Sequence, residues 1–211
     1  MSALYEDQKQ VCSHLKKLAV TGLGGGGTSG NISIYNREHN LIAISPSGID
    51  YDELSAEMIP IVDIEGNLVV GSYRPSSELK FHLKIYQERD DVSAVVHTHS
   101  VNAAAFSTLE IDLPAYHYII GYIGKKVPYI PYSVFGGEDL ANGIVGKIRD
   151  YNGIILGNHG VVTCGHNVRK AYAAAEAIEY LAAIHFKVSQ YKNVNVLSDT
   201  EMDLVLKKFK N

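Results

Sequence analysis

The segment AVVHTHS, at residues 94–100, places two histidines at alternate positions after an apolar run. Side chains alternate across a β-strand, so His97 and His99 would point to the same face. Their Cα atoms would lie about 7 Å apart, which allows both imidazole rings to reach one ion. This spacing favours a metal site, although spacing alone also permits two ordinary core or interface histidines.

Two further residues are candidate ligands, because a catalytic zinc usually has three protein ligands and keeps one position open. His159 lies in GNHGVV, where Gly157 and Gly160 leave space for another group to approach. Glu78 lies in PSSE, at the expected start of a helix. Spacing does not select His159 from the remaining histidines. Helical packing explains His82, one turn after Glu78, and we interpret as structural the side chains of His82, His14, His39, His166 and His185.

Three short segments combine hydroxyl groups with glycine or with an expected helix start: TSGN (28–31), SPSG (45–48) and PSSE (75–78). Free backbone N–H groups and serine hydroxyls can hold a phosphate without any lysine. Each segment alone is typical of an ordinary turn. Their combination with a metal site is harder to explain by turns alone and favours a site for an anion such as phosphate.

Helices and strands that would position these residues are mixed along the chain. Apolar spacing and helix-start signals predict helices over 3–20, 74–89, 137–151, 168–190 and 198–210, the last with a capping box of Ser198 and Glu201. Strands are expected within 32–36, 41–45, 60–70, 92–100, 127–130 and 153–165. This order predicts an α/β fold: a three-layer α/β/α single domain over 1–211 with a mostly antiparallel central sheet.

Composition argues against several classes of protein. The 211 residues are 46% hydrophobic and carry a net charge of −4, so no basic surface would attract nucleic acid or an anionic membrane. No apolar run approaches the roughly 20 residues of a membrane-spanning helix, and the polar start does not resemble a signal peptide. Cys12 and Cys164 are far apart and outside any metal motif, so we expect reduced thiols and a cytoplasmic location.

Taken together, several segments resemble the class II aldolase/adducin family. They are GTSGNIS, ISPSGIDYDEL, RPSSELKFHLKIYQERDDVSAVVHTHS, LPAYHYII, YSVFG, NHGVV and LSDTEMDLVLKKFK. They occur in the family's order and cover nearly the whole chain. Each is weak alone, whereas the set is specific. The similarity is greatest to the branch that cleaves L-fuculose 1-phosphate.

The resemblance implies one zinc ion (Zn2+) per chain, held by His97, His99 and His159, with Glu78 as a fourth ligand that can leave the metal. Tyr118 matches a family tyrosine that reaches into a neighbouring subunit's site, and members of this branch form homotetramers with sites between subunits. The resemblance also implies that the substrate phosphate is received by Asn31, Ser47, Gly48, Ser76 and Ser77.

The implied reaction is zinc-dependent retro-aldol cleavage of a ketose 1-phosphate, most simply L-fuculose 1-phosphate to dihydroxyacetone phosphate and L-lactaldehyde. Breaking the C3–C4 bond leaves an electron pair at C3, and the C2 ketone takes it up as an enediolate. A zinc ion beside those oxygens is a Lewis acid placed where the charge develops. Glu78 would exchange the C3 proton, and Tyr118 would handle the proton on the C4 oxygen.

Other members of the family remain alternatives. A sugar-phosphate 4-epimerase or a methylthioribulose-1-phosphate dehydratase could use the same chemistry. Epimerase-like members, however, generally have aspartate in place of Glu78 and lack the pair His117 and Tyr118. A non-catalytic module like the adducin head would have lost the metal ligands, whereas all four candidates are present here. The residues therefore favour an aldolase and leave its aldehyde product open.

Overall fold

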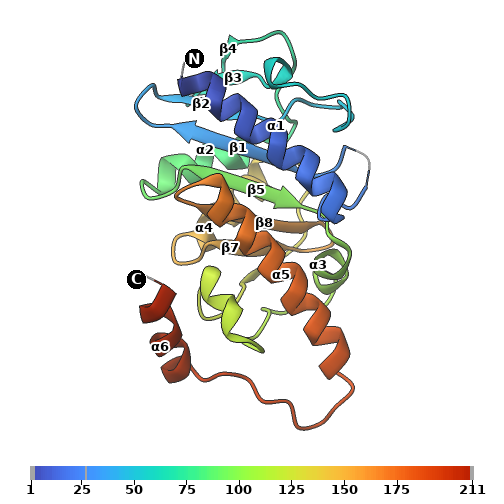
Figure 1. Ribbon diagram of the computed structural model, residues 1–211. Coiled ribbons are helices and arrows are strands. Elements are labelled where there is room, and N and C mark those ends of the chain that lie inside the picture. Colours follow the sequence, from blue (N-terminus) through green and yellow to red (C-terminus); the bar gives the residue numbers. More distant parts are fainter. Residues whose placement is uncertain (1–2, 27, 210–211) are drawn as a thin grey trace.

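The computed structural model describes residues 3–26 and 28–209, and a single eight-stranded sheet forms its centre (Figure 1). The strands are β1 (Asn31–Asn36), β2 (Leu41–Ile44), β3 (Ile61–Asp63), β4 (Leu68–Val70), β5 (Ala94–Thr98), β6 (Tyr129–Ile130), β7 (Gly153–Leu156) and β8 (Gly160–Gly165). Their spatial order is β4-β3-β2-β1-β5-β8-β7-β6. Among the strand pairs of the described residues, only β6 and β7 are parallel, so the predicted mostly antiparallel sheet is confirmed.

Helices cover both faces of this sheet, which gives the predicted α/β/α layers. In Figure 1, α1 (Ala3–Thr21) and α5 (Val168–Val188) lie in front of the sheet, and α2 (Leu79–Glu88) and α4 (Glu138–Ile148) lie behind it. The connections contain α3 (Val101–Phe106) and the 3-10 helices η1 (Ala56–Met58) and η2 (Tyr118–Tyr122). The last helix, α6 (Asp199–Phe209), contacts η2. Among the described helices, none is long and apolar enough to cross a bilayer.

The central strand β5 contributes to the core on both faces of the sheet. Ala94 and Val96 pack with residues of α1 and α5, whereas Val95 packs with residues of α2 and α4. Since side chains alternate along a strand, His97 shares the face of Val95 and points towards α2. Its ring contacts Phe81 of α2 at a centroid distance of 5.6 Å. The apolar alternation of β5 therefore decides which helix the first histidine meets.

The second helix begins later than the sequence pattern predicts. We expected a helix over 74–89, but α2 spans only Leu79–Glu88. Pro75 instead forms an isolated antiparallel bridge with Pro46, and the Ser76 N–H donates to the Ser45 carbonyl at 2.9 Å. Residues 75–78 therefore form a turn that ends at the helix start, which keeps both serines out of the helix.

The remaining predicted elements agree with the structure to within a few residues. The two hairpins, β3–β4 and β7–β8, are present. So is the capping box, in which Glu201 accepts from the Ser198 backbone N–H at 2.7 Å. Lys210, the last residue of the expected terminal helix, lies outside the described residues. The sequence pattern does not predict α3, η1 or η2.

Candidate metal centre and substrate site

Four side chains from three parts of the chain converge at one end of β5. They are Glu78, His97, His99 and His159, and their ligand atoms all lie within 4.8 Å of one another. Glu78 is the N-cap of α2, and His97 and His99 come from the end of β5 and the residue just after it. His159 lies in the turn between β7 and β8, beside β5, because β8 pairs with β5. The structure thus brings all four predicted ligands together.

Two glycines allow the backbones around the histidines to approach closely. A Cβ at Gly160 would collide with the Thr98 carbonyl and lie 2.9 Å from Cδ2 of His99. Gly30 has a φ of +89°, and a Cβ there would lie 2.8 Å from the His97 carbonyl oxygen. Gly157, also expected to make room near His159, faces Tyr129 instead, where a Cβ would lie 2.6 Å from the hydroxyl.

The ligand atoms of the four side chains face one another with more lone pairs than hydrogen-bond donors. His97 Nδ1 lies 2.9 Å from the Val161 carbonyl, so in the neutral ring it donates there and Nε2 is unprotonated. That Nε2 lies 2.7 Å from His99 Nε2 and 3.1 Å from Glu78 Oε2. Glu78 Oε1 is buried, and no described residue donates to it. A divalent cation with nitrogen and carboxylate ligands fits this donor set.

The surroundings of the cluster favour protonation states that metal ligands need. Burial lowers the pKa of His99 to about 3 and that of His159 to about 4, and the nearby His97 adds to both effects. Burial opposes ionisation of Glu78, but its interactions with His97, His159 and Asn31 outweigh burial and hold the pKa of its carboxyl below the usual range. The cluster therefore offers two neutral imidazoles, those of His99 and His159, and a carboxylate, which are forms that bind metals.

The three hydroxyl-rich segments lie next to one another beside Glu78. The bridge between Pro46 and Pro75 joins segment 45–48 to segment 75–78. The Ser45 hydroxyl bonds the backbone of Ile32 and so joins segment 45–48 to the start of β1. The N-terminus of α2 is here, and its dipole favours an anion. Four candidate phosphate residues are exposed or half-buried at this place: Ser47, Gly48, Ser76 and Ser77.

The fifth candidate phosphate residue, Asn31, differs from the other four. Its side chain is buried and its Nδ2 donates to Glu78 Oε2 at 2.8 Å. The amide also has a second N–H, which could serve a phosphate. Because Asn31 ends segment 28–31 and bonds Glu78, it connects the hydroxyl-rich segments to the cluster of candidate ligands.

Tyr118 is not brought to the candidate metal centre of its own chain. It begins η2, its exposed fraction is 57%, and it lines a surface pocket with residues of α5 and α6, including Lys170 and Phe209. None of the four candidate ligands lines that pocket. A catalytic role for this tyrosine would require a second copy of the chain.

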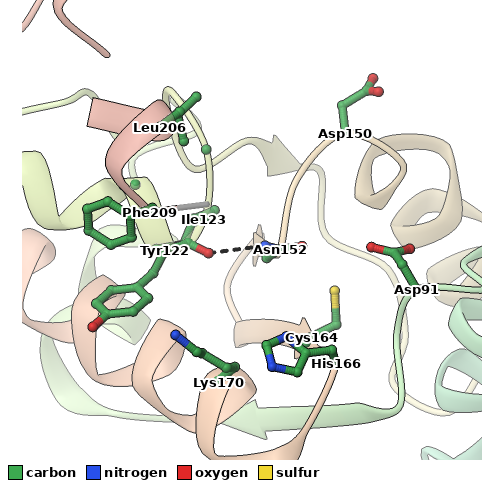
Figure 2. Close-up of a pocket in the computed structure, with 13 residues that line it drawn as sticks. Asp91, Tyr122, Ile123, Asp150, Asn152, Cys164, His166, Lys170, Leu206 and Phe209 are labelled. Atoms are coloured by element: carbon green, nitrogen blue, oxygen red, sulfur yellow. Dashed lines mark hydrogen bonds between the residues drawn. The ribbon is translucent and has the colours of Figure 1, made fainter. Parts of the chain in front are cut away.

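A further pocket lies at the other end of the β5–β8 pair (Figure 2). Its volume is about 490 Å³, and its lining includes Asp91, Cys164 and His166. Asp91 precedes β5 and His166 follows β8 in an antiparallel pair, so both lie at the end of β5 opposite His97. The interpretation of His166 as a residue outside the metal site agrees with this position.

The local sequence pattern does not reveal the hydrogen-bonded position of His82 behind the cluster. His82 is fully buried, as a packing residue would be, but its two ring nitrogens bond Asn31 and Ser33. The available signal was the spacing of three polar residues, Glu78, His82 and Tyr86, at every fourth position of a helix. Such a row of polar groups on a buried helix face requires hydrogen-bond partners.

Comparison with known proteins identifies the family of the chain. Residues 9–186 match the family model described as Class II Aldolase and Adducin N-terminal domain. The chain is 38% identical to a 5-deoxy-D-ribulose 1-phosphate aldolase of Bacillus thuringiensis, with 98% of this chain and 96% of that protein covered. It is also 38% identical to an L-fuculose phosphate aldolase of Haemophilus influenzae, with 94% and 90% covered.

A solved structure of an L-fuculose 1-phosphate aldolase has the same fold, with a TM-score of 0.95, 37% identity, and coverage of 100% of this chain and 98% of that one. The relatives are named aldolases, which supports an enzyme of the aldolase type. The matched family model and these relatives show that the chain belongs to the class II aldolase/adducin family.

Proposed function

We propose that this protein cleaves a ketose 1-phosphate between C3 and C4, with a divalent metal held by Glu78, His97, His99 and His159. The convergence of three imidazoles on a buried carboxylate carries the proposal. Bound there, the cation would act as a Lewis acid for the charge that develops on the ketone oxygen. We propose zinc, one ion per chain, because zinc is commonly bound by histidine nitrogen and carboxylate oxygen.

Glu78 is the proposed base that exchanges the proton at C3. Its place as the N-cap of α2 favours the ionised form, because the positive end of the helix dipole stabilises a carboxylate. Asn31 donates to Oε2, whereas Oε1 accepts from no described residue. Oε1 is therefore the oxygen left for the metal and, once Glu78 leaves the metal, for the C3 proton, while Asn31 holds the other oxygen in place.

The proposed site is completed by a neighbouring copy of the chain. Tyr118 is exposed and away from its own chain's candidate ligands, so we propose that it serves an adjacent subunit and handles the proton on the C4 oxygen. The resemblance to the family supports a homotetramer. Cys12 and Cys164 are free and buried, in keeping with action in the reducing cytoplasm.

Two substrates have support from relatives. L-fuculose 1-phosphate would give dihydroxyacetone phosphate and L-lactaldehyde, and 5-deoxy-D-ribulose 1-phosphate would give dihydroxyacetone phosphate and acetaldehyde. The relatives named for these two activities are each 38% identical to this chain, over 206 and 201 residues respectively. The two substrates share the phosphate and ketone end and differ in the aldehyde half by one hydroxylated carbon.

A coupled assay for dihydroxyacetone phosphate release tests the proposed function. Zinc-loaded protein should release it from at least one member of a panel of ketose 1-phosphates, and metal-free protein should not. The ratio of kcat/KM values for the two named ketoses would assign the substrate. Absence of release from every member of the panel by folded, zinc-loaded protein would contradict the proposed activity.

Replacing both Ser76 and Ser77 by alanine should raise the KM for a phosphorylated ketose by about tenfold or more, since hydrogen bonds to charged groups contribute about 1.5–3 kcal/mol each. The zinc content should stay at the wild-type value. Ser72→Ala, at an exposed serine of the same connection, is the matched control and should leave KM unchanged. Equal cleavage of the phosphorylated and unphosphorylated ketose by the wild type would contradict this assignment of the phosphate site.

A further inference from the structure

A buried row of polar side chains leads from Tyr86 to Glu78. The Tyr86 hydroxyl lies 2.6 Å from Ser33 Oγ, which lies 2.7 Å from His82 Nδ1. His82 Nε2 lies 2.6 Å from Asn31 Oδ1, and Asn31 Nδ2 lies 2.8 Å from Glu78 Oε2. All five residues are buried, and the three farthest from Glu78 are at most 1% exposed. Four hydrogen bonds thus connect the proposed base to the interior of the protein.

The row forms because polar residues at helical spacing on α2 face polar residues at strand spacing on β1. Glu78, His82 and Tyr86 are four residues apart, which places them on one face of α2 and its N-cap. Asn31 and Ser33 are two residues apart on β1, so they share the face of the sheet that α2 covers. Each polar residue of the helix thereby meets a polar residue of the strand.

Hydrogen-bond chemistry gives all four bonds the same direction. A carboxylate only accepts, so Asn31 turns its NH₂ towards Glu78 and its Oδ1 towards His82. Oδ1 also only accepts, so Nε2 of His82 carries the proton. Burial lowers the pKa of His82 to about 3, so the ring is neutral and its Nδ1 is an acceptor. The Ser33 hydroxyl therefore donates to Nδ1, and the Tyr86 hydroxyl donates to Ser33.

Two aromatic contacts restrict rotation of the rings in this row. The ring of Phe81 stacks on that of His82 at a centroid distance of 4.5 Å. Tyr35 packs on Tyr86 at 5.1 Å, and its own hydroxyl bonds Asn40 outside the row. With rotation restricted, the two hydrogen-bond partners of His82 decide which ring nitrogen carries the proton.

We propose that Tyr86, Ser33 and His82 are positioning residues that hold the Asn31 amide with its NH₂ towards Glu78. This inference rests on the proposed function, because it concerns the base of that reaction. In this orientation, one N–H of Asn31 holds Glu78 Oε2, and the second donates to no described residue and could serve the substrate phosphate. The opposite tautomer of His82 would turn Oδ1 towards the carboxylate and place two acceptors against each other.

Nitrogen-15 NMR of the histidine side chains in metal-free protein tests the direction of the row without any activity. Wild-type His82 should carry its proton on Nε2 and accept a hydrogen bond at Nδ1. Ser33→Ala should remove the hydrogen-bond shift at Nδ1. Tyr35→Phe deletes a hydroxyl of the adjoining ring outside the row and should leave His82 unchanged. A wild-type His82 protonated on Nδ1 would overturn the proposal.

A second test follows hydrogen exchange at C3 of dihydroxyacetone phosphate in deuterated water, with zinc-loaded, folded variants. Removing residues that orient a metal ligand typically costs about 10–100-fold, and we expect this loss in His82→Leu. His82→Gln keeps a donor for Asn31 and should recover most of the rate. Ser33→Ala, the smaller change, should show a partial loss and serves if the leucine variant does not fold.

The two proposals fail in different ways. If the folded, zinc-loaded wild type shows neither cleavage nor exchange, the proposed function is wrong, and the NMR result still decides the direction of the row. If the wild type is active, the positioning role would be refuted by undiminished exchange in both Ser33→Ala and His82→Leu. Where the leucine variant does not fold, undiminished exchange in Ser33→Ala alone would refute it. Equal losses in His82→Gln and His82→Leu would refute the requirement for a donor to Asn31.

Discussion

His97→Ala should bind metal more than about 100-fold less tightly than the wild type, because loss of even an outer partner of a ligand costs about 10–100-fold. His97 is fully buried, and its Nε2 lies between His99 and Glu78, at 2.7 and 3.1 Å. The alanine substitution removes the imidazole ring that faces both His99 and Glu78. Elemental analysis after dialysis should therefore find about one zinc per wild-type chain and little in the variant.

The matched control is His166→Ala. His166 is exposed and lies at the other end of the β5–β8 pair, so its replacement should leave the zinc content unchanged. Far-ultraviolet circular dichroism of all three proteins would show that the metal-free forms remain folded. Equal zinc content in the wild type and in folded His97→Ala would contradict the ligand assignment.

The first two candidate ligands could be predicted because their relation is local. The period of two along a strand places His97 and His99 on one side without any knowledge of the rest of the fold. His159 could not be selected by spacing, because it reaches the cluster only through pairing of β5 with β8. The hydrogen bond from His97 to Val161, for example, joins residues 64 positions apart. The family resemblance supplied what local geometry could not.

The predicted helices differ from those of the structure for the same reason, because contacts between distant parts of the chain also decide where a helix forms. Proline and two serines at 75–77 are typical of a helix start, but the bridge from Pro75 to Pro46 holds them in a turn. The short helix α3 has a weak local signal, and its first turn is capped by a carboxylate from another helix. Glu179 of α5 accepts from the backbone N–H groups of Asn102 and Ala103, 76 or more residues away. Such distant partners leave no trace in a local pattern.

Replacing Glu78 by glutamine should lower turnover by at least about two orders of magnitude, since general base catalysis is typically worth about 10²–10⁴ in rate. Glutamine keeps the shape of the side chain but cannot accept the C3 proton. Asn31 donates to Oε2, so the new amide would present its oxygen to Asn31 and its NH₂ where Oε1 was. That NH₂ is a poor metal ligand, so zinc content must be measured beside the rate.

Hydrogen exchange with dihydroxyacetone phosphate alone separates proton transfer from metal binding. In deuterated water, the wild type should exchange one hydrogen on the hydroxyl-bearing carbon without any aldehyde, because the proposed base Glu78 would remove and return that proton. Glu78→Gln, loaded with excess zinc and assayed with its measured metal content, should not. A control at Ser72→Ala should exchange as the wild type does. Wild-type exchange in zinc-replete Glu78→Gln would place the base elsewhere, and Tyr118 of a neighbouring copy would be the next residue to test.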